Sequence, residues 1–146
     1  MQEEEEEVHD SPQDWVARHI EEFLATDGLS RGARRRLLLT TRGRRTGKLR
    51  RTALYYWADG PDRWFVVGSN GGSAKHPAWY LNLTADPHVT VQIGPEVFRA
   101  VASTVTGDER ARMWKVVTDH MSAYESFERK TRREIPVVVL TRGPAD

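Results

Sequence analysis

Two segments of this chain combine glycines with side chains that bind anions or planar rings. Residues 43–51 hold four arginines and two glycines, and both arginine forks and exposed backbone N–H groups bind phosphate or carboxylate. Residues 69–83 place two glycines and Lys75 before Pro77, which can open a helix that carries Trp79 and Tyr80. A helix start offers N–H groups to an anion, and aromatic faces can flank a planar ring. Together the segments predict a ligand that is polyanionic at one end and planar at the other.

Each segment also has a plainer interpretation. The arginines of residues 42–51 are equally consistent with a solvated hairpin or with a weak nucleic-acid patch. Trp79 and its neighbours fit the packing of a short helix against a sheet. A nucleic-acid function leaves residues 69–83 unexplained, so we expect no nucleic-acid partner.

Hydroxyl groups are the candidates for catalysis. A phenol can donate a proton to a bound carbonyl or nitro oxygen, or orient it. Because side chains alternate along a strand, only one of Tyr55 and Tyr56 can face the site. The candidates are Tyr55, Tyr56, Ser69 and Tyr124.

Other catalytic patterns are missing from the sequence. There is no cysteine, no GxSxG elbow, no P-loop and no GxGxxG fingerprint after a strand. His76 has no second histidine or carboxylate at ligand spacing, so no metal site is expected.

Composition indicates one globular domain. The 146 residues are 38% hydrophobic and 29% charged, with a net charge of +1, which predicts a single domain over residues 11–146. The acidic run Glu3–Glu7 predicts a disordered tail over residues 1–10. No apolar run approaches the roughly 20 residues that span a bilayer, and the acidic start does not resemble a signal peptide. We therefore expect a cytoplasmic protein.

Periodicity predicts an α+β fold. Ser11-Pro12 starts a helix over residues 12–26, and Thr106-Gly107-Asp108-Glu109 resembles a capping box that opens a second one. The apolar face of that second helix is predicted to carry Ala111, Trp114, Val117 and Met121. Further helices are expected over residues 77–84 and 122–130, and strands over 36–41, 52–58, 64–69, 89–93, 97–105 and 135–141. The short turns between the strands favour an antiparallel barrel, and the last strand is expected to be buried on both faces.

Three segments, in this order, resemble the deazaflavin-dependent nitroreductase family. They are residues 38–50, 69–83 and 131–140. The similarity extends over residues 37–141. The resemblance implies an antiparallel split β-barrel, related to flavin-binding barrels, with the N-terminal helix and two or three flanking helices. It also implies coenzyme F420, a deazaflavin with a phosphate-linked oligoglutamate tail.

The resemblance assigns roles to particular residues. It implies that the tail side of the coenzyme contacts Arg44, Arg45, Thr46, Arg50, Arg51, Thr52, Ala53, Leu54 and Tyr55. It implies that the ring and linker contact Val67, Gly68, Ser69, Asn70, Ala78, Trp79, Tyr80, Leu81 and Asn82, and the charge of Lys75 adds this residue to the group. Tyr124 corresponds to a tyrosine over the deazaflavin and the substrate pocket.

Two departures from the family pattern bear on the substrate. Ala53 replaces a common proline, which loosens the turn without removing binding. Met121 and Phe127 occupy places where the family tends to have tyrosines, so the substrate pocket formed by Met121, Tyr124 and Phe127 is more apolar. We therefore expect hydride transfer from reduced F420 to an apolar conjugated acceptor, a quinone, an enone or a nitroaromatic, with nitro compounds disfavoured.

Alternatives remain open at this point. FMN is the alternative cofactor, and a non-catalytic deazaflavin-binding protein is the alternative function. The helix over residues 12–26 is expected to cover the pocket as a lid, or to make a weak, peripheral membrane-surface contact. The nearby acidic residues favour the lid.

Overall fold

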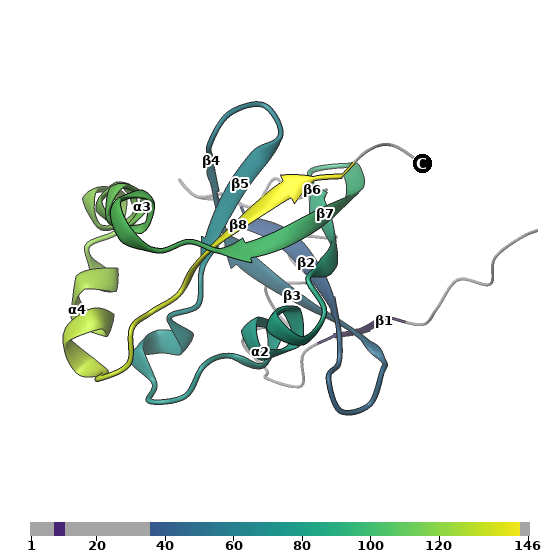
Figure 1. Ribbon diagram of the computed structural model, residues 1–146, viewed down its shortest axis with the longest axis horizontal. Coiled ribbons are helices and arrows are strands. Elements are labelled where there is room, and N and C mark those ends of the chain that lie inside the picture. Colours follow the sequence, from purple (N-terminus) through teal and green to yellow (C-terminus); the bar gives the residue numbers. More distant parts are fainter. Residues whose placement is uncertain (1–7, 11–35, 144–146) are drawn as a thin grey trace, which may run out of the picture.

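A single curled sheet organises the part of the chain described by the computed structural model, residues 8–10 and 36–143 (Figure 1). Its strand order is β1-β3-β2-β6-β7-β8-β5-β4. Neighbouring strands run antiparallel, except that β1 pairs in parallel with β3. The strands are β1 (Val8–Asp10), β2 (Arg36–Arg42), β3 (Leu49–Tyr55), β4 (Trp57–Ala58), β5 (Arg63–Val67), β6 (His88–Ile93), β7 (Glu96–Thr104) and β8 (Val137–Arg142).

Three helices lie against this sheet. They are α2 (Ala78–Ala85), α3 (Gly107–His120) and α4 (Ala123–Lys130), and a 3-10 turn, η1 (Asn70–Gly72), precedes α2. In Figure 1, α3 and α4 lie side by side at one end of the sheet, while α2 lies near β2 and β3. The predicted α+β class with an antiparallel sheet is confirmed.

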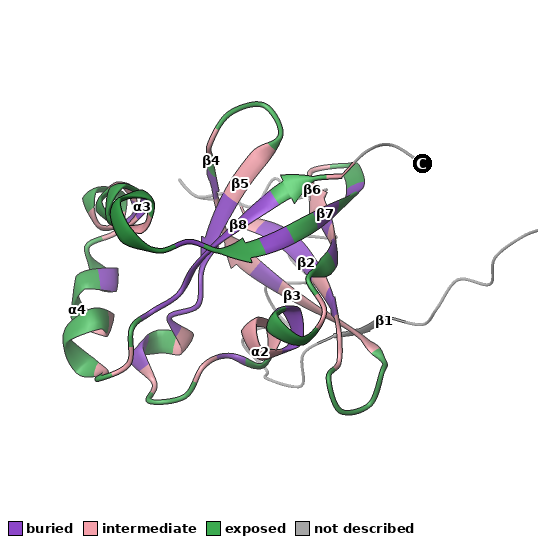
Figure 2. Ribbon diagram, in the orientation of Figure 1, coloured by how far each residue is buried: buried purple, intermediate pink, exposed green. Residues whose placement is uncertain are grey.

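The sheet has a hydrophobic cluster on each side, and β8 contributes to both. Val138 and Leu140 pack into the cluster that contains Leu37 and Val91, whereas Val137 and Val139 pack into the other cluster with α3 and α4. This alternation follows from the period of two along a strand. Burial of the strand on both faces is confirmed, and Figure 2 shows β8 and β5 buried along most of their length.

Several local expectations need correction. The strand expected over residues 52–58 begins earlier, at Leu49, and is interrupted at Tyr56 between β3 and β4. Thr106 is the N-cap of α3, but its side chain makes no capping hydrogen bond, so the predicted capping box is wrong. The buried residues of α3 are Met113 and Val117, while Ala111 is exposed. Val117 lies in the cluster of α3 and α4, and Trp114 and Met121 pack against it, so Ala111 is the one wrong residue of the predicted face.

Within the N-terminal 35 residues, the structure describes only residues 8–10. Val8–Asp10, part of the predicted disordered tail, form β1 against β3. The predicted helix over residues 12–26 lies outside the described residues. Among the described helices, none is both long enough and apolar enough to cross a membrane.

Candidate active site

A cavity of about 940 Å³ lies where β2, β3, the end of β5, α2 and α4 meet. We call it the main cavity. Its lining is basic on the side of the β2–β3 turn and aromatic on the sides of α2 and α4. The lining residues are Arg36, Thr41, Gly43, Arg44, Arg45, Thr46, Arg50, Arg51, Thr52, Ala53, Leu54, Tyr55, Val67, Ser69, Asn70, Gly71, Ser73, Pro77, Ala78, Trp79, Asn82, Tyr124 and Phe127.

The basic side is shaped by backbone hydrogen bonds within residues 42–48, the basic turn. The Gly43 N–H donates to the Lys48 carbonyl at 2.7 Å, and the Gly47 N–H donates to the Gly43 carbonyl at 2.8 Å. Gly47 has a φ of 72°, a left-handed conformation that glycine adopts without strain. The closed turn holds the exposed Arg44 and Arg45 beside one another at the cavity rim, where an anionic group can pair with both.

Asn82 fixes the basic turn to the rest of the site. This side chain is only 4% exposed, and its oxygen accepts hydrogen bonds from the Arg44 backbone N–H at 3.1 Å and from the Arg44 guanidinium at 3.2 Å. Its amide nitrogen donates to the buried Thr41 hydroxyl at 3.1 Å. One residue of α2 therefore sets the position of the turn relative to the end of β2.

Tyr55 and Tyr56 face opposite sides of their strand, as alternation requires. Tyr55 lines the main cavity, and its hydroxyl accepts a hydrogen bond from Arg36 at 3.0 Å. The Arg36 guanidinium also lies over the Tyr55 ring, 4.7 Å from the centroid. Tyr56 packs against the hydrophobic cluster on the other face instead, which leaves its hydroxyl outside the site.

Residues 68–76, the glycine loop, form the wall between β5 and α2. Asn70, Gly71 and Gly72 have φ values of 48°, 64° and 80°, so three consecutive residues are left-handed. A Cβ atom at Gly72 would lie 3.1 Å from the Phe127 Cα and 3.2 Å from the Phe127 carbonyl oxygen. This close approach places α4 directly against the loop and explains a glycine at this position.

His76, at the end of the glycine loop, lies beside the positive charge of Arg133. Its Nδ1 lies 3.1 Å from the Arg133 guanidinium, and its ring packs 4.9 Å from that of Tyr80. A guanidinium can only donate, so Nδ1 accepts this bond and the ring is neutral. Burial, together with the charge of Arg133, lowers the pKa of His76.

Tyr124 and Phe127 form the aromatic side of the cavity on α4. Their rings make an edge-to-face contact with centroids 5.4 Å apart, and Tyr124 also meets the Trp57 ring edge-on at 6.2 Å. Tyr124 is 9% exposed, so its ring is held within the second hydrophobic cluster while part of it lines the cavity.

Most of the residues singled out in the sequence therefore meet in one cavity. Six of them are not among its lining residues: Tyr56, Gly68, Lys75, Tyr80, Leu81 and Met121. Gly68 faces Pro136, whose Cγ would lie 2.8 Å from an added Cβ, and the Tyr80 hydroxyl pairs with Thr104 at 3.1 Å. A whole segment cannot line a cavity, because side chains alternate between the two sides of a strand and a helix turns only one face toward it.

The main cavity also has lining residues that were not predicted from the sequence. They are Arg36, Thr41, Gly43, Gly71, Ser73 and Pro77. Gly43, Gly71, Ser73 and Pro77 lie inside the two segments singled out from the sequence, so proximity was the signal that could have found them. Arg36 and Thr41 enter through the pairing of β2 with β3, which no local pattern reveals.

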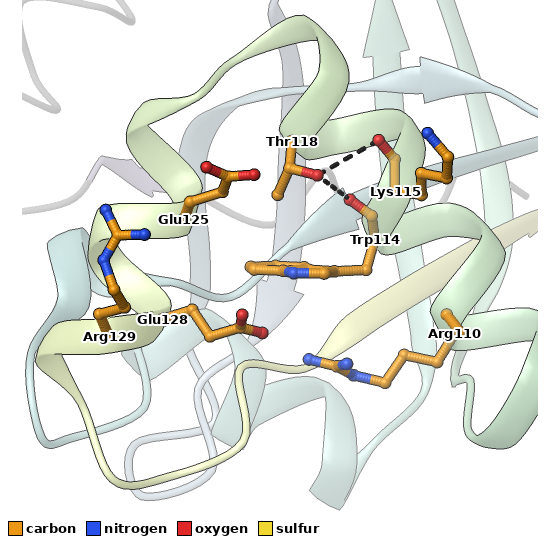
Figure 3. Close-up of a pocket in the computed structure, with 8 residues that line it drawn as sticks. Arg110, Trp114, Lys115, Thr118, Glu125, Glu128 and Arg129 are labelled. Atoms are coloured by element: carbon orange, nitrogen blue, oxygen red, sulfur yellow. Dashed lines mark hydrogen bonds between the residues drawn. The ribbon is translucent and has the colours of Figure 1, made fainter.

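A second, shallower hollow of about 510 Å³ lies between α3 and α4 (Figure 3). Trp114 extends from α3 toward α4, where Glu125, Glu128 and Arg129 lie opposite it. Charges of both signs surround the indole, and the one hydroxyl drawn there, that of Thr118, donates to the Trp114 and Lys115 carbonyls within α3. Across residues 8–10 and 36–143, no cluster of histidines and carboxylates has the arrangement to hold a metal ion.

Comparison with known proteins identifies the relatives of this chain. A family model described as F420H(2)-dependent quinone reductase matches residues 15–142. An F420H(2)-dependent quinone reductase of Mycobacterium tuberculosis (strain ATCC 25618 / H37Rv) is 37% identical over 144 residues, covering 88% of this chain and 96% of that protein. A solved structure described as a domain-swapped dimer is 36% identical, with a TM-score of 0.68 over 89% of this chain and 99% of that chain. Another, of an F420-H2 dependent reductase (FDR-A), is 36% identical, with a TM-score of 0.65 over 72% of this chain and 92% of that chain.

These matches confirm the expected relationship to F420-dependent reductases and sharpen it. The matching family is described as F420H(2)-dependent quinone reductase, which is narrower than the nitroreductase family named from the sequence. The family model extends over nearly the whole chain, and a curated relative exceeds 30% identity over most of it. The chain belongs to the F420H(2)-dependent quinone reductase family.

Proposed function

We propose that this protein transfers a hydride from reduced coenzyme F420 to a quinone in the main cavity. Family membership makes the chain an oxidoreductase whose cofactor is reduced coenzyme F420. The observation that supports the main cavity as the site is its division into a basic and an aromatic side. The site is proposed from this division, and the quinone from the family together with the apolar Phe127 beside Tyr124.

The lining of the main cavity fits the two ends of the coenzyme. Arg44, Arg45 and Arg50 line the basic side, where they are available to a phosphate and carboxylates. Val67, Ala78 and Trp79 line the side toward α2, where apolar and aromatic faces suit a planar ring. A volume of about 940 Å³ lies at the upper end of the range for small-molecule sites, as a long cofactor and an acceptor require.

The bound cofactor supplies the hydride, and the chain supplies position and a proton. Reduction of a quinone to a hydroquinone takes one hydride and one proton, so a donor must face the acceptor oxygen. Tyr124, Tyr55 and Ser69 line the cavity, and their hydroxyls are the candidate donors. Tyr124 is favoured because it lies beside Phe127, on the side assigned to the acceptor.

Phe127 directs acceptor choice in this proposal. Its ring lines the cavity and offers no hydroxyl to a nitro group. An apolar conjugated carbonyl compound has a smaller desolvation cost than a nitro compound when it binds against such an apolar ring. Quinones and enones are therefore the proposed acceptors.

One titration followed by one screen tests the proposal. Oxidised coenzyme F420 is titrated into the protein by fluorescence, and oxidation of the reduced form is then followed with menadione, cyclohexenone and a nitroimidazole. We expect saturable binding, with quinone and enone turnover above nitroimidazole turnover. Highest turnover with the nitroimidazole contradicts the acceptor assignment. Binding without turnover supports a non-catalytic protein, and a flavin absorbance without F420 binding supports FMN.

A further inference from the structure

Arg133 holds the glycine loop from outside the main cavity. Its Nε donates to the Ser73 carbonyl at 3.0 Å, and its terminal nitrogens donate to the Gly68 carbonyl at 3.1 Å and to the Ser69 carbonyl at 2.7 Å. The same guanidinium donates to His76 Nδ1 at 3.1 Å. One side chain therefore binds both the beginning and the end of the loop, although it lies more than 55 residues away along the chain.

Only a guanidinium suits this set of acceptors. It presents five N–H donors in a rigid planar fork, and three carbonyls and one imidazole nitrogen lie around it. An ammonium has three donors on a single nitrogen and cannot reach both ends of the loop in the same way. Burial lowers the pKa of Arg133, but an arginine remains charged at any physiological pH.

The segment that carries Arg133 is itself fixed to the loop. The Gly68 N–H donates to the Pro136 carbonyl at 2.9 Å, and β8, which follows, pairs with β5, which precedes the loop. The glycine loop therefore packs between two segments: α4, which contacts Gly72, and residues 133–136. This framework gives the guanidinium a defined position.

The loop needs such external support. Asn70, Gly71 and Gly72 are left-handed, and two glycines in sequence give the free loop many alternative conformations. Inside the loop, the structure gives few ties: Gly72 N–H to Ser69 O at 2.9 Å, Ser73 N–H to Asn70 O at 3.1 Å, and two side-chain contacts around Lys75. Arg133 therefore makes as many hydrogen bonds to the loop as these bonds within it.

We infer that Arg133 is the positioning residue of the main cavity, which preorganises the glycine loop for the deazaflavin and thereby sets cofactor affinity. The inference rests on the proposed function of the cavity. Ser69, Asn70, Gly71 and Ser73 line the cavity, whereas Arg133 does not. Arg133 therefore acts through the loop, by removing from binding the cost of ordering it.

The experiment compares Arg133→Met and Arg133→Lys with the matched control Arg132→Met. Arg132 is the exposed neighbouring arginine, so the control removes the same charge from the same segment. Two quantities are measured: the Kd for oxidised coenzyme F420, and hydrogen exchange of the Gly72 and Ser73 amides without cofactor. The exchange of amides in β5 and β8 serves as the internal reference.

For Arg133→Met we expect both quantities to change about tenfold or more, with faster loop exchange and weaker binding. Arg133→Lys should fall between it and the wild type, and it replaces the methionine variant if that one does not fold. The kcat with menadione at saturating cofactor should fall by a smaller factor than cofactor affinity does, because the bound cofactor itself orders the loop. Arg132→Met should match the wild type.

Two results overturn the inference. Unchanged exchange in both Arg133 variants shows that the loop does not depend on the guanidinium. Faster exchange with an unchanged Kd shows a structural tie that does not serve the site. If the wild-type protein does not bind coenzyme F420 at all, the proposed function fails, and the hold of Arg133 on the loop is then judged by exchange alone.

Discussion

Tyr124 is the residue on which the chemistry of the proposed reaction depends most directly. Its ring is fixed by edge contacts to Trp57 and Phe127, and the residue lines the main cavity. Tyr124→Phe keeps these ring contacts and removes the proton donor. We expect kcat with menadione to fall by about 10²-fold while the Kd for coenzyme F420 changes little.

Tyr80→Phe is the matched control for Tyr124→Phe. The Tyr80 hydroxyl pairs with Thr104 and does not line the cavity, so this variant should keep the wild-type kcat. An unchanged kcat in Tyr124→Phe contradicts the assignment and leaves Tyr55 or Ser69 as the donor.

His76 makes the stability of the protein depend on pH. Burial and the Arg133 charge lower its pKa in the folded state, so the unfolded state binds this proton more readily. The contribution of neutral His76 is therefore fully present above the ordinary histidine pKa of about 6.5 and is lost as the pH falls through the lower folded-state pKa. Acid should weaken the contact with Arg133.

A comparison with His76→Asn measures this effect. The asparagine oxygen can accept from Arg133 but does not titrate between pH 5 and 8. We expect the Tm of the wild type to fall more than the Tm of His76→Asn as the pH is lowered from 7.5 to 5. The two proteins are otherwise identical in sequence, so the comparison isolates position 76. A constant difference contradicts the assignment.

At the scale of elements, Asn82 joins α2 to β2 and to the basic turn. Asn82→Ala leaves the buried Thr41 hydroxyl without this donor and releases the Arg44 backbone. Leaving a buried polar group unsatisfied costs about 1–3 kcal/mol, so we expect Tm to fall by roughly 3–10 °C. Binding of coenzyme F420 should weaken in parallel, because the turn loses its anchor.

Thr84→Ala provides the control on the same helix. The exposed Thr84 hydroxyl only donates to the Leu81 carbonyl within α2, so its loss should change stability by less than about 0.5 kcal/mol. Equal Tm values for Asn82→Ala and Thr84→Ala show that Asn82 does not hold the turn.

Local patterns predicted the elements well but not their register. Residues 97–105 alternate clearly and give β7, and Pro77 marks the start of α2 to within a residue. Tyr56, in contrast, lies at the break between β3 and β4, which depends on pairing with β5 and not on any residue of its own segment. Strand pairing is a long-range property, so the sequence pattern alone cannot fix it.

The same limit applies to the site. The basic turn and the glycine loop are local motifs, and both line the main cavity. Arg36 and Arg133 act across the fold, one through the β2–β3 pairing and one through the approach of residues 133–136 to Gly68. Neither contact can be predicted from residue spacing. The sequence therefore indicates the class of ligand but not the residues that position the basic turn and the glycine loop.

At the scale of the whole molecule, one sheet has a hydrophobic cluster on each face. Because its strands contribute to both clusters, the sheet couples the α2 side of the main cavity to the α4 side. The cluster containing Leu37 and Leu140 also receives Trp79 of α2, whereas the cluster containing Met113 and Val117 holds Tyr124 of α4. The main cavity lies between these two helices. A change deep in one cluster should therefore disturb the whole domain, because β8 belongs to both.

Leu140→Ala tests this coupling. Leu140 is 0% exposed, and loss of such a side chain costs about 2–5 kcal/mol. For a chain of this length we expect Tm to fall by roughly 6–18 °C. Unfolding should remain a single transition, coincident by far-UV circular dichroism and by tryptophan fluorescence, because each cluster contains tryptophans. Val101→Ala, which shortens a 42% exposed side chain on β7, should keep the wild-type Tm. Two separate transitions in Leu140→Ala show that the clusters fold independently and that the sheet does not couple them.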